Sequence, residues 1–234
     1  MIASVVHPGV ELDNQAVHPY RPEEASDLAG ALSGMPGLVF EAHSTGCQST
    51  PSLSRMVDYG FAVLKVGPGL SFAPREALYG LDAIASWVVP GWRDHPLSAG
   101  VEEEMLARPE HWEPYCPGGP DRQRLPRHFS YSDRVRYYWA SPRLRQAVDS
   151  LLGRLGAEGV PATLVSQLLP EPCDRVAEGS LPATPRVLLV EAVRDELRRY
   201  SAACGARPGA GRGAGDRPSR TGRGERRRRS HPSP

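Results

Sequence analysis

Three short apolar runs, each followed at once by a turn that opens with a reactive side chain, constrain the fold most strongly. The runs span residues 2–6, 38–40 and 61–64, and the turns after them begin at His7, Glu41 and Lys65. In α/β proteins ligands bind at the C-terminal ends of parallel strands, because loops converge there and helix N-termini favour anions. The pattern therefore predicts parallel strands with a functional site at these turns.

The segments between the runs predict helices, and so a β-α-β-α-β order. Residues 22–32 have proline at their start, acidic side chains in the first turn and apolar residues at helical spacing. A second helix is expected from Thr50-Pro51 to about Tyr59. Crossovers of this kind join parallel strands.

After Gly69 the pattern changes to helices alone. Helices are expected over 73–89, over 100–107, after the N-cap residues Ser132 and Ser141, and over 185–203. In the last of these, one apolar face predicts a docking stripe, made of Val187, Leu188, Val190, Val193, Leu197 and Tyr200. We therefore expect a partial β/α barrel over 1–90, a helical region over 91–204 and a disordered tail over 205–234.

Composition excludes several classes of protein. Among 234 residues there is no apolar run of about eighteen, so a membrane-spanning helix is not expected, and the N-terminus does not resemble a secretory signal. The four cysteines, Cys47, Cys116, Cys173 and Cys204, are scattered, which argues against a disulfide framework and against a cysteine zinc site. A cytoplasmic protein is the expectation.

The charge is unevenly distributed although its total is only +1. Residues 205–234 hold nine arginines against Asp216 and Glu225, which leaves the preceding part of the chain acidic. This tail consists mostly of Gly, Arg, Pro and Ser, so it is expected to be disordered. Binding to nucleic acid through Arg226–Arg229 is the alternative to a solvated extension, and it is disfavoured because no aromatic residue is interleaved to stack on bases.

Lys65 is the only lysine, although lysine and arginine together number 28. A compact ammonium donates to phosphate oxygens or changes its pKa in ways that the planar guanidinium of arginine does not. Its place in a glycine-rich turn after a strand favours a functional role. The alternative is a side chain that only extends its charge into solvent from a strand end.

Three parallel strands are too few for a closed α/β unit. They leave both sheet edges unpaired and the apolar faces partly bare. The sequence therefore suggests the back part of a larger α/β barrel.

Several long motifs, in order, resemble the C-terminal portion of one family. They are VVHPGVELDNQAVHPYRPEEA, LVFEAHSTGCQ, FAVLKVGPGLSFAPREALYGL, HFSYSDRVRYYW and TLVSQLLP. Together they are similar to the accessory, non-catalytic subunit of class II D-tagatose-1,6-bisphosphate aldolase, the GatZ/KbaZ-like family, over about residues 2–204. The resemblance implies a TIM-barrel-like fold of which this chain supplies the last three β/α units. It also implies association with a catalytic class II aldolase subunit that uses zinc in galactitol or amino-galactose breakdown.

The strand-end turns are also suited to sugar-phosphate chemistry. The His43 turn resembles the turn after the seventh strand of catalytic class II aldolases, where a histidine ligates zinc, and His7 falls near a second zinc histidine. Glu41, two residues before His43, is expected on the same strand face, as an acid/base group or as an orienting group, and the alternative is a carboxylate that only faces solvent. Zinc needs at least three converging protein ligands. The alternative for each histidine is an imidazole hydrogen-bonded at a strand end.

The phosphate side of such a site is expected at the seventh and eighth strands of the barrel. The predicted phosphate-binding residues are Ser44, Thr45, Lys65, Gly67 and Ser71. Lys65 and Glu41 are also the candidate catalytic residues. Simple loop geometry is the alternative explanation for the glycines and proline of these turns.

Two groups of residues outside the turns are also notable. One is expected to have a structural role, and the other has two possible roles. Arg75, near the start of the next helix, is expected to form an ion pair that fixes that helix rather than to take part in catalysis. The aromatic and arginine-rich segment 131–139 is either an interface anchor or the buried stripe of a helix.

The sequence supports two alternative functions. The first is an accessory aldolase subunit, which needs no cofactor of its own. The second is a metal-dependent ketose-phosphate epimerase or aldolase site that would use zinc on His43 and His7.

Overall fold

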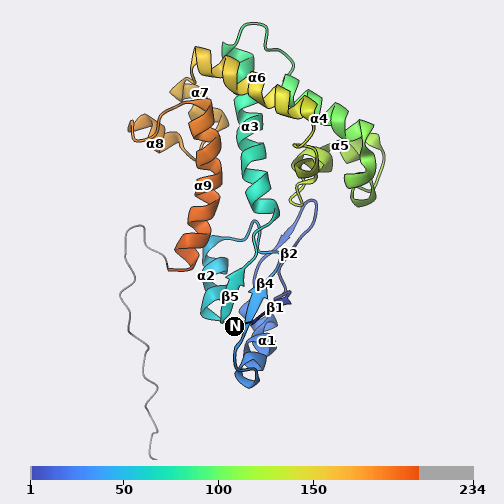
Figure 1. The fold of residues 1–234 in the computed structure, drawn as a ribbon, viewed down its shortest axis with the longest axis vertical. Coiled ribbons are helices and arrows are strands. Elements are labelled where there is room, and N and C mark those ends of the chain that lie inside the picture. Colours follow the sequence, from blue (N-terminus) through green and yellow to red (C-terminus); the bar gives the residue numbers. More distant parts are fainter. Residues whose placement is uncertain (1, 206–234) are drawn as a thin grey trace, which may run out of the picture.

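The computed structural model describes residues 2–205, and its centre is a small parallel sheet. The strands are β1 (Ile2–Val6), β4 (Leu38–Ala42) and β5 (Phe61–Leu64), in the order β1-β4-β5, and both pairings are parallel (Figure 1). The predicted strands and their parallel arrangement are confirmed. The predicted disordered tail lies outside the described residues from residue 206 onward.

The first crossover differs from the expected single helix. It contains a short antiparallel hairpin, β2 (Glu11–Leu12) and β3 (Val17–His18), which the sequence did not predict. The helix expected over 22–32 is divided into a 3-10 turn η1 (Pro22–Glu24), α1 (Ser26–Ala31) and a second 3-10 turn η2 (Leu32–Gly34). The Ser26 hydroxyl donates to the Glu23 carbonyl (3.1 Å), a local bond that competes with a continuous helix.

The second crossover is the expected helix, α2 (Thr50–Asp58). Its N-cap is Ser49, whose hydroxyl accepts from the backbone N–H of Ser52 at 3.2 Å. The extended cap followed by proline explains why the helix begins here.

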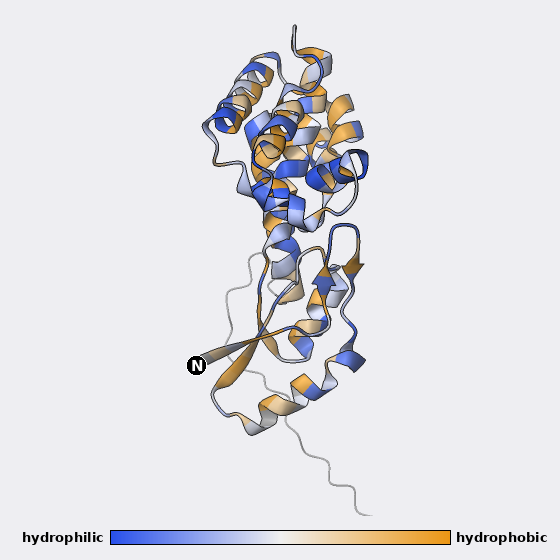
Figure 2. Ribbon diagram, turned by 90° about the vertical axis from the view of Figure 1, so that its right-hand side faces the viewer, coloured by the Kyte–Doolittle hydropathy of each residue, from blue (hydrophilic) through white to orange (hydrophobic). Residues whose placement is uncertain are grey.

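Only one face of the sheet is covered. Phe40 and Phe61 point to that face and form an apolar core with Tyr20 and Met56. On the opposite face Val5 and Val63 are 51% and 39% exposed. Figure 2 shows the apolar strands with helices on one side only. Parallel sheets are normally buried on both faces, so the open apolar face is a surface that favours being covered.

The rest of the described chain is helical. Helix α3 (Pro68–Val88) starts directly after the β5 turn and runs away from the sheet (Figure 1). The elements that follow are α4 (Pro96–Ala107), η3 (Pro109–His111), η4 (Glu113–Tyr115), α5 (Pro120–Phe129), η5 (Arg134–Tyr137), α6 (Pro142–Glu158), α7 (Ala162–Leu168), α8 (Cys173–Ala177) and α9 (Pro185–Ala203). None of the helices within residues 2–205 is both long and apolar enough to cross a bilayer.

Some expected helix boundaries are corrected. Helix α3 begins at Pro68 rather than at residue 73, and α4 begins at Pro96 rather than at residue 100, because proline suits the first helical turn. The segment after Ser132 forms only the 3-10 turn η5. There Val135 and Tyr138 are buried, as expected of a packing stripe.

Helix α9 has the predicted bounds, but its buried face is not the predicted apolar stripe. Leu188 is buried, whereas Val190 and Leu197 are 49% and 47% exposed. Glu191 is buried instead and is bridged by Arg175 (2.5 Å), so charge pairing replaces part of the apolar contact. In Figure 1 α9 runs from the helical region back to α2 beside the sheet.

One buried carboxylate joins α3 to the start of α4. Asp82 accepts from the Trp92 indole N–H (2.9 Å) and from the backbone N–H groups of Leu97 (3.3 Å) and Ser98 (3.1 Å). The last two donors belong to the first turn of α4, which has no partner for them within its own helix. Asp82 therefore caps α4 from outside.

Replacing Asp82 by alanine should lower the free energy of unfolding by about 3 kcal/mol, because it leaves these buried donors without an acceptor. Urea unfolding followed by circular dichroism measures the change. Asp149→Ala, at an exposed position of α6, is the matched control and should change the free energy by less than about 0.5 kcal/mol. Equal effects of the two substitutions would contradict the capping role.

Candidate functional site

The predicted reactive residues gather on the uncovered face of the sheet. Strand pairing places Val5, Glu41 and Val63 side by side. The backbone ladder continues one step further, since the N–H of His43 donates to the Val6 carbonyl (3.0 Å) and that of Lys65 to the Ala42 carbonyl (2.9 Å). Because side chains alternate along a strand, this register puts His7, His43 and Lys65 next to one another, at the ends of the three strands.

Glu41 orients His43. The Nε2 atom of His43 lies 3.0 Å from Oε1 of Glu41, and the two side chains are 21% and 26% exposed. The ring of His43 meets the ring of His7 edge to face, with centroids 5.5 Å apart. With the carboxylate accepting from Nε2–H, the Nδ1 atom of a neutral His43 has a lone pair for a proton or a ligand.

These residues do not by themselves form a zinc centre. Two imidazoles come together, and the nearest carboxylate, Glu41, is bonded to one of them. Between residues 2 and 205, no group of three His, Cys, Asp or Glu side chains is arranged to hold a metal. A third ligand would have to come from outside this part of the chain.

The turn after β4 is held in a strained conformation. Ser44 and Cys47 have φ angles of 58° and 62°, in the left-handed region that residues with a side chain seldom adopt. Such strain persists only where surrounding contacts impose it, and it is common at functional sites. Gly46 permits the turn to approach α3, since a Cβ there would lie 3.3 Å from the backbone nitrogen of Gly69.

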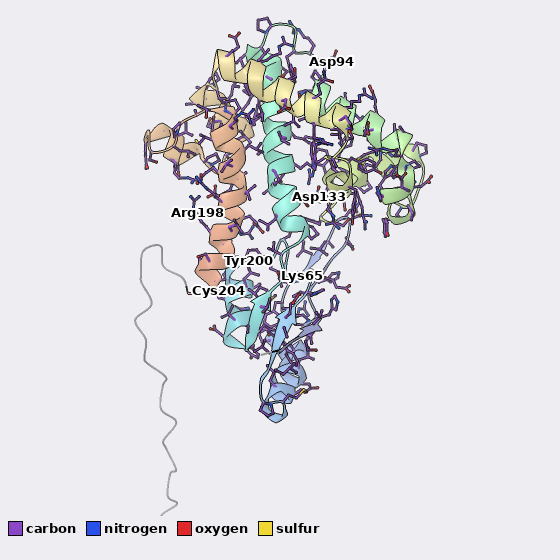
Figure 3. The ribbon with its side chains drawn as sticks, viewed as in Figure 1. Lys65, Asp94, Asp133, Arg198, Tyr200 and Cys204 are labelled. Carbon is purple, nitrogen blue, oxygen red and sulfur yellow. The ribbon has the colours of Figure 1, made fainter. Side chains whose placement is uncertain are left out.

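The predicted phosphate-binding side chains have different surroundings. The hydroxyl of buried Thr45 donates to the Lys65 carbonyl (2.8 Å), and that of Ser71 donates to the Pro68 carbonyl (3.2 Å). Ser44 and Gly67 are half-buried, and Lys65 is exposed where the strands meet the helical region (Figure 3). Lys65, Ser44 and Gly67 are therefore at least partly accessible.

The C-terminal turns of α9 brace this site, which the sequence did not reveal. The Tyr200 hydroxyl donates to the Thr45 carbonyl (2.8 Å), and Nη2 of Arg199 donates to the Gln48 carbonyl (2.7 Å). A Cβ at Gly69 would lie 2.7 Å from Oε1 of Glu196, so α9 also presses on the start of α3. These partners are more than a hundred residues apart in the chain, and no spacing in the sequence links them.

Gln48 ties the same turn to the segment after the hairpin. Its side chain is buried, accepts from the Tyr20 backbone N–H (3.0 Å) and donates to the His18 carbonyl (2.8 Å). Burial raises the pKa of the neighbouring Cys47 thiol to about 11 and that of Tyr200 to about 12. Both groups are thus neutral near pH 7, and the turn is held by hydrogen bonds.

Comparisons with known proteins agree on one family. The family model described as "D-tagatose-1,6-bisphosphate aldolase subunit GatZ/KbaZ-like" matches residues 1–205. A protein of Agrobacterium fabrum named D-tagatose 6-phosphate 4-epimerase is 46% identical over 206 residues, which are 88% of this chain and 48% of that protein.

A solved structure is similar to the same extent. It is described as a probable tagatose 6 phosphate kinase from Sinorhizobium meliloti 1021, and it superposes with a TM-score of 0.84 at 45% identity, over 87% of this chain and 53% of that one. The chain spans about half the length of the relatives it matches.

Replacing Tyr200 by phenylalanine should lower the free energy of unfolding by about 1 kcal/mol, because the Thr45 carbonyl loses its donor. Amide hydrogen exchange across residues 43–48 should also become faster, since the strained turn is held from this side. Tyr59→Phe, which removes an exposed hydroxyl, is the control. Unchanged exchange at residues 43–48 in Tyr200→Phe would show that α9 does not brace the turn.

Proposed function

Because the chain belongs to the D-tagatose-1,6-bisphosphate aldolase subunit GatZ/KbaZ-like family, we propose that its strand ends form part of a site that epimerises D-tagatose 6-phosphate at C4. The observation that carries this proposal is the bonded Glu41–His43 pair beside His7, on an uncovered sheet face. The name of the Agrobacterium relative supports the choice of substrate. The product would be D-fructose 6-phosphate, the C4 epimer.

The chemistry of this substrate limits the mechanism. The ketose carbonyl is at C2, so the hydrogen on C4 is not acidified by it, whereas the C3–C4 bond is activated. Removal of the C4 hydroxyl proton by a base lets that bond break, and its electron pair moves to C3 and into the carbonyl as an enediolate. The glyceraldehyde 3-phosphate fragment rotates, and the bond re-forms on the other face of the aldehyde. Return of the proton from the base to the C4 oxygen then gives the epimer without net oxidation.

We assign roles from the geometry. His43, oriented by Glu41 through Nε2, uses Nδ1 as the base for the hydroxyl proton. The ammonium of Lys65, at the adjacent strand end, offsets the charge that develops on the substrate. No step is assigned to zinc, since the described residues do not complete a zinc centre.

We also propose that the sheet is part of a TIM-barrel-like structure. The exposed Val5 and Val63 side chains and the unpaired edges of β1 and β5, within the described residues, are what further strands would cover. The matched relatives are about twice as long as the matched segment, which supports this reading. In such a barrel His7, His43 and Lys65 would stand at the mouth that the strand ends share.

A second candidate is the accessory role. The family description names an aldolase subunit, and the same uncovered face offers a surface to a catalytic class II aldolase subunit. In this reading the chain would stabilise its partner during tagatose-related carbohydrate catabolism and would not need a base of its own.

Epimerisation is tested with the chain alone and co-expressed with the N-terminal half of the Agrobacterium relative. Conversion of D-tagatose 6-phosphate is followed by enzymatic detection of D-fructose 6-phosphate. His43→Gln should lower the rate by about 100-fold or more, because it removes the base. His111→Gln, at an exposed position of the helical region, is the matched control.

The mechanism and the alternative each have a distinguishing outcome. In D2O the product should retain hydrogen at C4, and deuterium at C4 would contradict cleavage of the C3–C4 bond. If neither preparation epimerises the sugar but the chain raises the activity of a class II tagatose-bisphosphate aldolase, the accessory role holds. Failure of both assays would contradict both proposals.

A further inference from the structure

Arg75 and Asp133 form an ion pair with both side chains at 0% exposure, at the junction between α3 and the segment before η5. Nε of Arg75 donates to Oδ1 of Asp133 at 2.8 Å. The expected ion pair at Arg75 is thus confirmed, and its partner lies 58 residues away in the chain. Asp133 lies beside the lower part of α3, on the side of the helical region that faces the strand ends (Figure 3).

Several hydrogen-bonding atoms of this buried ion pair have no partner. Within residues 2–205, neither Nη1 nor Nη2 of Arg75 has a hydrogen-bond partner, and Oδ2 of Asp133 has none either. A guanidinium has five N–H donors, and only the one on Nε is used here. The N–H groups on Nη1 and Nη2 outnumber the one carboxylate oxygen without a partner. The pair therefore lacks acceptor oxygen atoms, not donors. Buried polar groups without partners are rare in proteins, and each one needs a physical explanation.

The walls around the guanidinium are aromatic. Its central carbon lies 4.3 Å from the centre of the Phe72 ring, 5.7 Å from that of Phe129 and 5.8 Å from that of Tyr79. These rings hold the guanidinium plane without using its N–H groups. They also exclude water, which strengthens any charge-assisted bond formed there.

The segment that closes over Arg75 is strained and is tied to the β2–β3 hairpin. Asp133 has a φ of 47°, in the left-handed region. The preceding residues are tied to the tip of the β2–β3 hairpin, since the Ser130 hydroxyl donates to Oδ1 of Asn14 (2.7 Å) and the Tyr131 N–H donates to the Asn14 carbonyl (3.2 Å). Movement of Asp133 away from Arg75 would relieve the backbone strain. It would also give Nη1 and Nη2 of Arg75 and Oδ2 of Asp133 access to new hydrogen-bond partners.

We propose that Arg75 is an anion anchor that binds a phosphate monoester through Nη1 and Nη2 when the 130–133 segment moves aside. A guanidinium binds two oxygens of a phosphate in parallel, which satisfies both unpaired nitrogens. Arg75 comes seven residues after Pro68, the first residue of α3, and so about 10 Å along the helix axis. The identity of the ligand as a ketose phosphate rests on the proposed function, whereas the anion site does not.

Binding of inorganic phosphate to the full chain, measured by titration calorimetry, tests the anchor. Arg75→Met should weaken phosphate binding by at least about tenfold, because the charge-assisted bonds are lost. Asp133→Asn should strengthen it by at least about threefold, since it removes the carboxylate that competes for the guanidinium. A purely structural ion pair would lose stability in both variants and leave phosphate affinity unchanged.

The matched control is Arg127→Met. Arg127 is also buried and lies 4.7 Å from an aromatic ring, that of Trp112, but both Nε and Nη2 donate to Glu102. The Arg127→Met substitution should leave phosphate affinity unchanged. If Arg75→Met does not fold, Asp133→Asn decides alone, and weaker or equal binding in that variant overturns the proposal.

D-tagatose 6-phosphate separates the anchor from the proposed function. Phosphate binding that depends on Arg75 but is not displaced by the sugar phosphate would support the anchor and contradict the substrate assignment. Epimerisation with an unchanged KM in Arg75→Met, together with phosphate binding that does not depend on Arg75, would overturn the anchor and leave the proposed function standing.

Discussion

The site depends on the contact between the end of α9 and the turn after β4, two segments that are far apart in the chain. The Tyr200 hydroxyl and the Arg199 guanidinium donate to carbonyl groups of that turn. Ser44 and Cys47 are in left-handed conformations that a free turn would leave. Because α9 also packs along α3, the helical region and the strand ends are fixed relative to each other. The positions of His43 and Lys65 therefore depend on a helix that carries no reactive group itself.

The uncovered sheet face combines two opposite demands. Val5 and Val63 favour burial, whereas Glu41, His43 and Lys65 on the same face favour contact with water or with a polar ligand. Both demands are met where an apolar interior opens into a polar mouth. Val5 and Val63 lie in one layer with Glu41, and His43 and Lys65 lie further along, at the strand ends. The arrangement suits the proposed barrel and is costly for an isolated three-stranded sheet.

Local patterns in the sequence predicted the elements whose signals are local. The three strands and helix α9 were correctly located, because apolar runs, an N-cap and a first-turn proline each act within a few residues. The β2–β3 hairpin was missed, since strands of two residues have no periodicity to read. Helix α5 was missed as well, and it contains Pro126, which signals a break. The clustering of His7 with His43 followed from strand order, but the pairing of Arg75 with Asp133 had no sequence signal.

The edge of β1 has a consequence for anything that joins this sheet. Its backbone pairs with β4 on one side, and among the described residues no strand lies on the other. Since side chains alternate between faces with a period of two, a neighbour shifted by a single residue would turn its whole apolar set outward. Productive alignments with β1 therefore differ by even numbers of residues. The sheet thus admits only every second offset of an incoming strand, which halves the number of registers in which it can be extended.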